Sequence, residues 1–269
     1  MTLRSVVNQS LLPEELIVAD DGSDSETAKV VKDCLETVGI KWRHVWHMHR
    51  GVRQSRIKNL AVSYSTTGYL IFIDQDVVLH PEFIADHISL ADSRVFLQGK
   101  RVLLSQHLTS RVLKREILKP PSLWTIGLNN RKNSMYLPRL GRLLARTKRF
   151  ETSLRGCNLS MHRSDFLAVD GFDETFDGTW GREDSDICYR LFHTGVKIKT
   201  VWCAALQYHL HHAVTKNWEK MRLDGELLKN INERRKMAIK GYSLLSKEGR
   251  IITSADPIRT HTGASIKFP

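Results

Sequence analysis

Residues 69–76 read Tyr-Leu-Ile-Phe-Ile-Asp-Gln-Asp, a hydrophobic run followed by two carboxylates one residue apart. A run this continuous predicts a strand that is covered on both faces, as a central parallel strand is. Residues 16–21 read Leu-Ile-Val-Ala-Asp-Asp and have the same form. The chain therefore contains two predicted buried strands that each end in acidic side chains.

Helices are predicted between the strands. Ser23 and Glu26 have the spacing of a capping box, and apolar residues then recur on one helical face as far as Gly39. A strand at 40–46 and a helix at about 52–65 complete the alternation. Alternating strands and helices are typical of α/β proteins, in which ligands bind beyond the carboxyl ends of the strands. Both acidic clusters occupy such ends.

A second set of elements is expected after residue 155. Residues 156–160 lead into a short helix, and Glu183 and Asp184 open a longer one. A strand at 196–202 then precedes the histidine-rich segment 208–212. In the longer helix Asp184 shares a face with the apolar residues that follow it, so its side chain is expected to point inward.

The charge is unevenly distributed. The net charge of the 269 residues is +12, and residues 100–149 hold 13 Lys or Arg against one acid, Glu116. Pro120-Pro121 and the lack of a clear strand pattern predict that this segment is a basic, partly helical insertion. A protein with such a segment could also neutralise phosphates, so a nucleic-acid-binding protein is an alternative interpretation. That alternative leaves both acidic clusters unexplained.

Residues 139–150 have the pattern of a basic amphipathic helix. Its apolar side comprises Leu140, Leu143, Leu144 and Phe150, and the flanking basic residues are Arg139, Arg142, Arg146, Lys148 and Arg149. Such a helix could rest on an anionic bilayer or be a merely solvated helix. Because no run reaches the roughly 20 apolar residues of a membrane span, we expect a cytoplasmic protein, peripheral at the inner face of the membrane.

The carboxylates can serve two kinds of chemistry. Asp74 and Asp76 can hold a divalent cation that bridges a diphosphate, because hard cations prefer oxygen ligands, although Asp-x-Asp is also common on loops. Glu183 and Asp184 could simply favour the positive end of a helix dipole. Trp180 nearby offers a ring on which a sugar could stack, and a buried carboxylate beside an aromatic residue can act as a general base.

The histidine-rich segment is a candidate for metal binding. His209, His211 and His212 could form a metal cluster, since imidazole is a good ligand for borderline ions. Alternating histidines also occur on half-exposed strands without any metal. Of the three, His209 is the ligand that we predict.

These residues together resemble the family 2 glycosyltransferases with the GT-A fold, including a galactosyltransferase-type C-terminal motif. The resemblance implies a single compact α/β domain: a Rossmann-like mixed sheet that binds a nucleotide sugar, flanked by helices and carrying the basic helical insertion. The matching segments, in order, are residues 16–23, 51–59, 69–76 with His80-Pro81, 156–160, 171–174 and 180–184.

The resemblance also implies residue roles. Asp20, Asp21, Arg53 and Lys58, with Arg56 as a further candidate, would contact the nucleotide or diphosphate. Asp74 would bind the ribose or the metal. Asp76 and His209 would hold a Mn²⁺ or Mg²⁺ ion. Asp184 aligns with the catalytic base. Glu183 and Trp180 align with positions that contact the acceptor, and Glu183 is also predicted to be catalytic together with Asp184.

The implied reaction is an inverting single displacement. Asp184 takes a proton from a hydroxyl of a glycan or lipid-linked acceptor, which attacks the anomeric carbon of a nucleotide sugar, with UDP as the favoured carrier. The resemblance points to the assembly of cell-surface polysaccharide or lipopolysaccharide. The expected division of the chain is 1–98 for nucleotide-sugar binding, 99–150 for the basic connection, 151–215 for acceptor binding and catalysis, and 216–269 for a C-terminal helix and tail.

The resemblance has one departure. Family members open with an apolar strand, whereas residues 1–9 match the helix that follows that strand. Either the start of the chain is assigned too late, or the protein lacks part of its nucleotide pocket. An impaired glycosyltransferase-like protein that binds without turnover is therefore a further alternative.

Overall fold

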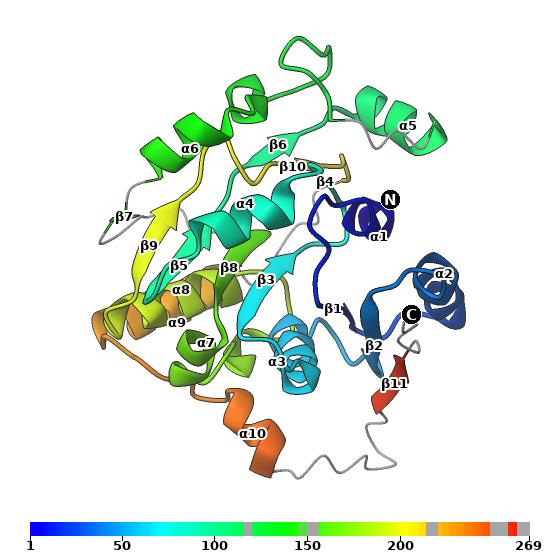
Figure 1. The fold of residues 1–269 in the computed structure, drawn as a ribbon. Helices are drawn as coiled ribbons and strands as arrows, with labels where there is room; N and C mark the ends of the chain where they lie inside the picture. The colour runs from blue at the N-terminus through cyan, green and yellow to red at the C-terminus, as the bar shows by residue number, and fades with distance from the viewer. Residues whose placement is uncertain (116–119, 146, 149–155, 214–219, 248–257, 263–269) are drawn as a thin grey trace, which may run out of the picture. The chain divides into compact units, whose positions relative to one another are not determined.

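The computed structural model describes residues 1–115, 120–145, 147–148, 156–213, 220–247 and 258–262. It has the mixed α/β architecture that the sequence predicts, with sheets flanked by helices (Figure 1). The chain forms two compact units, each built from separate segments. Unit 1 comprises residues 1–12, 69–162 and 197–215, and unit 2 comprises residues 13–68, 163–196 and 216–269.

Unit 2 contains a three-stranded sheet in the order β1-β2-β11. Strands β1 (Glu15–Asp20) and β2 (Lys41–His47) are parallel, and β11 (Ile258–Thr262) runs antiparallel to β2. Helix α3 (Gln54–Tyr64) packs on β1 and β2, and Val45, Ile57 and Leu60 form a buried cluster in this unit. The predicted strand–helix–strand–helix order of this part of the chain is confirmed.

Helix α2 (Ser25–Leu35) begins one residue later than the capping-box pattern predicts. Its N-cap is Asp24, whose carboxylate accepts hydrogen bonds from the backbone N–H groups of Glu26 and Thr27. Ser23 instead donates its own N–H to Asp20 Oδ1. The prediction of Ser23 as the cap was therefore wrong, because an ionised carboxylate one residue further along is an equally good cap.

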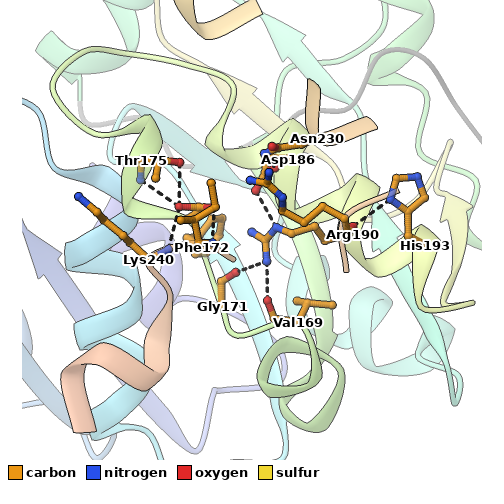
Figure 2. Close-up of polar contacts among 12 residues, drawn as sticks. Val169, Gly171, Phe172, Thr175, Asp186, Arg190, His193, Asn230 and Lys240 are labelled. Atoms are coloured by element: carbon orange, nitrogen blue, oxygen red, sulfur yellow. Dashed lines mark hydrogen bonds and ion pairs between the residues drawn. The ribbon is translucent and has the colours of Figure 1, made fainter. Parts of the chain in front are cut away.

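A buried ion pair lies within one of the remaining helices of unit 2. These helices are α7 (Arg163–Ala168), the 3₁₀ turn η2 (Glu174–Phe176), α8 (Glu183–His193), α9 (Lys220–Asn232) and α10 (Tyr242–Lys247). Figure 2 shows Arg190 of α8 reaching Asp186 one turn earlier and the carbonyl oxygens of Val169 and Gly171. Asn230 of α9 donates to the other oxygen of Asp186 (2.7 Å). This network joins α8 to α9 and to the loop after α7.

Unit 1 contains a five-stranded sheet in the order β3-β8-β5-β9-β7. Its strands are β3 (Tyr69–Ile73), β8 (Asn158–His162), β5 (Val95–Gln98), β9 (Lys197–Thr200) and β7 (Thr147–Lys148). The strand at 69–73 is confirmed, but it lies at one end of this sheet and pairs antiparallel with β8. The prediction of a central parallel strand was wrong, since a continuous apolar run reports burial and not the direction of the neighbouring strand.

A second sheet of unit 1, in the order β4-β10-β6, positions two predicted metal ligands. Strand β4 (Val77–Leu79) is antiparallel to β10 (Gln207–His209), with Val77 opposite His209. The N–H of Leu210 donates to the carbonyl oxygen of Asp76 (2.8 Å). Helix α1 (Thr2–Val7) packs against β4. This pairing holds Asp76 and His209 side by side.

The basic segment contributes more regular structure than its sequence predicts. It contains β6 (Arg101–Leu103), α5 (Gln106–Arg115), the 3₁₀ turn η1 (Arg131–Ser134) and α6 (Pro138–Leu144), besides β7. Strand β6 is parallel to β10, and β7 is antiparallel to β9. Strands of two or three residues are too short to give a periodic pattern, which is why none was predicted. Arg146, Arg149 and Phe150 lie outside the described residues, as do residues 151–155 and 214–219 of the expected divisions.

A buried polar chain links α4 (Phe83–Leu90) to β8. His87, which has no exposed surface, contacts Asn158 Oδ1 through Nε2 (2.9 Å) and Ser160 Oγ through Nδ1 (2.8 Å). Because Asn158 Nδ2 donates to the carbonyl oxygen of Ala205, its Oδ1 accepts the Nε2 proton of a neutral His87. Burial lowers the pKa of His87 to about 4, although the bond to Asn158 opposes the shift.

We expect stability to fall on acidification because of His87. Its pKa of about 4 in the folded protein lies below the value of about 6.5 in the unfolded chain, so the unfolded state takes up the proton first. The stabilisation is complete above about pH 6.5 and declines by roughly 3 kcal/mol as the pH falls to about 4. Urea unfolding between pH 7.5 and pH 4 measures this slope. His87→Gln should flatten it, and an unchanged slope in that variant would contradict the assignment.

Candidate active site

The acidic pair at the end of β1 is held by two histidines of β2. Asp20 Oδ2 lies 2.8 Å from His44 Nε2, and Asp21 Oδ1 lies 2.6 Å from His47 Nε2. Asp20 and both histidines are buried, whereas Asp21 keeps 15% of its side chain exposed. Of the two predicted nucleotide contacts, Asp21 is therefore the one that a ligand of unit 2 can reach.

Hydrogen bonding stabilises the charged form of both carboxylates. Burial alone would raise the pKa of Asp20, but bonds from His44 and from the Ser23 backbone outweigh it, so the pKa lies below its usual range. The pKa of Asp21 is lowered in the same way, by His47 and by the N–H of Arg53. The sequence analysis did not identify the two histidines as partners of the acidic pair. Their positions on the next strand along the chain are the signal that could have suggested this role.

The predicted basic residues lie in or beside the first turns of α3. The N–H of Arg53 donates to Asp21 Oδ2 (2.8 Å), so this residue meets the acidic pair through its backbone. Arg56 pairs with Glu174 (3.5 Å). Asp177, which sequence reasoning missed, caps the helix by accepting the N–H groups of Ser55 and Arg56. Asp177 lies 122 and 121 positions along the chain from these two residues, so its capping role leaves no local sequence pattern.

Lys58 joins α3 to the two carboxylates at the start of α8. Its Nζ lies 3.0 Å from Asp184 Oδ1 and 3.2 Å from Glu183 Oε1, and it sits over the ring of Phe172 at 4.9 Å. All four residues belong to unit 2. The sequence assigned Lys58 to the diphosphate and the carboxylates to catalysis, and the structure brings these residues into direct contact.

Glu183 and Asp184 differ in exposure. The Glu183 side chain is 9% exposed, and its pKa is raised by burial and by the nearby Asp184, against the opposing effect of Lys58. Asp184 is 25% exposed, so it points inward less than its helical face predicts, because it lies in the first turn of α8. Trp180, just before this helix, is 49% exposed. The partly exposed carboxylate and the exposed ring are both accessible to a ligand.

Unit 1 holds a separate group of candidate ligands. One ligand atom from each of Asp76, His209 and His212 lies within 4.8 Å of the others. Asp76 Oδ2 is 3.2 Å from His209 Nε2 and 3.1 Å from His212 Nε2. Burial lowers the pKa of His209, and Arg101 and His212 add to the shift while Asp76 opposes it. This effect favours the neutral imidazole that metals bind.

The structure thus distributes the predicted site residues over both units. Asp74, Asp76 and His209 belong to unit 1. Among the described residues, the group of candidate ligands consists of Asp76, His209 and His212 and does not include Asp74. The other predicted site residues belong to unit 2: Asp20, Asp21, Arg53, Lys58, Trp180, Glu183 and Asp184.

The fold identifies the class of protein. It is the GT-A fold of glycosyltransferases, similar to the crystal structure of S. aureus TarS 1–349 in complex with UDP-GlcNAc. The TM-score is 0.59 and the sequence identity 13%, over 87% of this chain and 61% of that one. The chain belongs to glycosyl transferase family 2, whose model matches residues 1–154. The model described as the N-terminal domain of galactosyltransferase matches residues 144–213.

Similar sequences include three enzymes of sugar transfer. Validoxylamine A glucosyltransferase of Streptomyces hygroscopicus subsp. limoneus is 28% identical over 72% of this chain and 45% of its own length. Chondroitin synthase of Escherichia coli is 25% identical over 78% of this chain and 32% of its own length. Hyaluronan synthase of Pasteurella multocida is 25% identical over 75% and 22%. The chain therefore spans less than half the length of each of these relatives.

Proposed function

We propose that this chain is an inverting glycosyltransferase that moves a sugar from a nucleotide sugar to a hydroxyl of a glycan or lipid-linked acceptor. The observation that carries the proposal is the position of Asp184. Its carboxylate is partly exposed, and one oxygen lies 3.0 Å from the ammonium group of Lys58. The ion pair holds this carboxylate in place while part of it stays exposed, and a general base must be positioned within reach of the proton that it takes. Family membership supplies the reaction class.

The proposed chemistry is a single displacement. Asp184 accepts the proton of the acceptor hydroxyl, and the hydroxyl oxygen forms a bond to the anomeric carbon while the bond to the nucleoside diphosphate breaks. Glu183 and Trp180 bind the acceptor sugar, the ring by stacking. Inversion follows because the attacking oxygen and the leaving oxygen are on opposite faces of the sugar. The proposal places acceptor binding and catalysis in residues 151–215.

The donor is proposed to be a UDP-sugar bound by residues 1–98. Asp21, Arg53, Lys58 and Asp74 are its proposed contacts, and Asp20, which is buried, is not among them. Support for the carrier comes from TarS, which has been crystallised with UDP-GlcNAc. Two relatives named as chondroitin and hyaluronan synthases support a role in cell-surface polysaccharide assembly.

Asp76 and His209 are proposed to hold a divalent cation, with Asp74 as a further ligand from the sequence. The residues fit a cation because Asp76 Oδ1 is buried without a hydrogen-bond partner among the described residues. A buried carboxylate oxygen needs a partner, and a bound cation would provide one. When bound, a Mn²⁺ or Mg²⁺ ion would stabilise the negative charge of the departing diphosphate.

We expect Asp76→Ala to abolish metal-dependent donor binding. Removing the carboxylate deletes the anionic ligand, and the remaining imidazoles bind Mg²⁺ and Mn²⁺ weakly. The test is calorimetric titration of a panel of nucleotide sugars with and without Mn²⁺ or Mg²⁺. Glu82→Ala, which removes a carboxylate at the start of α4, is the matched control and should bind like the parent. A parent chain that binds no nucleotide sugar would refute the proposed function itself.

We further propose peripheral contact with an anionic membrane through the basic segment. Within the part of the chain that the structure describes, no helix is long and apolar enough to cross a bilayer. Leu143 on α6 is 75% exposed, and Trp124 and Ile126 in the same segment are 81% and 83% exposed. Arg139 and Arg142 add positive charge to the helix that carries Leu143. Exposed apolar residues among basic ones are the combination that anionic interfaces attract.

We expect the chain to float with anionic vesicles and not with neutral ones. The double variant Arg139→Glu with Leu143→Ser should lower the bound fraction, since each basic residue near the surface contributes about 1 kcal/mol. Lys29→Glu on α2 makes the same charge change as the first substitution and should leave binding unchanged. Equal flotation of the parent and the double variant would remove the membrane proposal while leaving the enzymatic one intact.

A further inference from the structure

The group formed by Asp76, His209 and His212 contains one more imidazole than the predicted metal site. His212 lies three residues beyond the end of β10, and its side chain is 55% exposed. Its Nε2 approaches the same carboxylate oxygen, Asp76 Oδ2, that His209 Nε2 approaches. Two imidazole nitrogens therefore converge on one carboxylate oxygen, and the two rings lie 5.2 Å apart between centroids.

The separations are those of ligands that share an ion. Donors at neighbouring corners of an octahedral ion with bonds of about 2.1 Å are about 3.0 Å apart, and donors on a tetrahedral ion about 3.4 Å. Asp76 Oδ2 lies 3.2 Å from one imidazole nitrogen and 3.1 Å from the other, between these two values. Each imidazole nitrogen therefore lies at a ligand-to-ligand distance from the carboxylate oxygen, and all three ligand atoms lie within 4.8 Å of one another.

A hydrogen bond from the other nitrogen of the His212 ring shows which nitrogen carries a proton and which one faces the carboxylate. His212 Nδ1 lies 2.9 Å from the carbonyl oxygen of Ala213, and because a carbonyl can only accept, Nδ1 carries the proton. Nε2 is then the nitrogen left to face Asp76 Oδ2, 3.1 Å away, and it is the atom that would bind a cation shared with this oxygen. An imidazole N–H held by a backbone carbonyl is also the usual support of a metal-bound histidine.

We propose that His212 is the third protein ligand of the cation, and that the resulting two-imidazole, one-carboxylate set selects a first-row transition-metal ion over Mg²⁺ or Ca²⁺. The inference rests on the proposed metal site at Asp76 and His209 and adds both a ligand and a selectivity. Imidazole suits Zn²⁺, Co²⁺ and similar borderline ions, whereas Mg²⁺ and Ca²⁺ prefer oxygen donors. The second imidazole is thus the group that shifts the preference of the site.

The test measures metal binding alone, on the full chain without a nucleotide sugar. Calorimetric titration with Co²⁺ and with Mg²⁺ gives the ratio of the two affinities for the parent, His212→Ala and His211→Ala. His211 is the matched control, because it is an exposed neighbour whose backbone N–H bonds Thr109 Oγ1 and whose ring is outside the group of ligands. Pulsed EPR of bound Mn²⁺ counts the coordinated imidazole nitrogens directly.

We expect His212→Ala to lose Co²⁺ affinity by at least about 10-fold, a loss that removal of even a supporting partner of a metal ligand can cause. Mg²⁺ affinity should change little, and the EPR signal should report two imidazoles in the parent and His211→Ala but one in His212→Ala. Co²⁺ affinity and nitrogen count unchanged in His212→Ala would overturn the inference, as would a parent that binds no Co²⁺. Metal binding by this pattern in a chain that binds no nucleotide sugar would refute the proposed function and leave the ligand assignment standing.

Discussion

Asp184→Asn is expected to lower donor turnover by about 10²- to 10⁴-fold, the contribution that a general base typically makes. The amide has nearly the shape of the carboxylate, and its oxygen can still accept a hydrogen bond from Lys58, so the fold and donor affinity should be retained. What it loses is the ability to take a proton. Hydrolysis of the bound donor, with water in place of the acceptor hydroxyl, gives the rate, and calorimetry gives the affinity.

Two further variants make this experiment decisive. Asp33→Asn on α2 repeats the chemical change at an exposed position and should hydrolyse the donor at the parent rate. Glu183→Gln separates the roles of the adjacent carboxylates, since the buried Glu183 has a raised pKa and is proposed to bind the acceptor. If Asp184→Asn turned over within a few-fold of the parent while Glu183→Gln did not, Glu183 would be the base and our assignment of the pair would be reversed.

Arg190→Ala is expected to cost about 3–5 kcal/mol of folding free energy, the usual result of removing one partner from a buried ion pair. Arg190 and Asp186 are 1% and 0% exposed, and their closest atoms are 2.7 Å apart. Among the described residues, the substitution leaves the Asp186 carboxylate with Asn230 as its hydrogen-bond partner, and it removes a charged donor from the carbonyl oxygens of Val169 and Gly171. Urea unfolding of parent and variant measures the difference.

The chain offers a control with the same spacing. Lys32 on α2 and Glu36, the residue directly after α2, are also four residues apart, at 3.6 Å, but their side chains are 62% and 59% exposed. Lys32→Ala should therefore cost no more than about 0.5 kcal/mol. Similar costs for the two alanine variants would mean that the pair in α8 is not desolvated as its burial indicates.

The sequence predicted the elements of this fold better than their pairing. The helices at 54–64 and 183–193 and the strands at 15–20 and 69–73 follow from hydrophobic periodicity, which reports which residues are buried. It does not report which strand lies next to which. The antiparallel neighbour of β3 comes from residues 158–162, and the short strands β6 and β7 depend on partners at least 50 residues away.

The candidate site was predictable to a similar extent. Its carboxylates can be recognised in the sequence because they come directly after apolar strands or stand at the start of a helix close to a tryptophan. Their partners do not stand out, since Lys58 meets Asp184 across 126 residues and His44 meets Asp20 across 24. These contacts are set by tertiary packing, so a single sequence gives the groups that carry the chemistry but not the groups that hold them in place.

The pairing of β11 with β2 bears on how the chain is made. Ile258 lies opposite His47, 211 positions earlier, so an emerging polypeptide has β2 long before it has the partner for that edge. At about 5–20 residues per second, translation leaves this edge unpaired for roughly 10–40 s. During that interval exposed backbone groups of β2 are open to another strand. During synthesis on the ribosome this edge can therefore pair with a strand of another chain, and a chaperone that covers it would prevent that pairing.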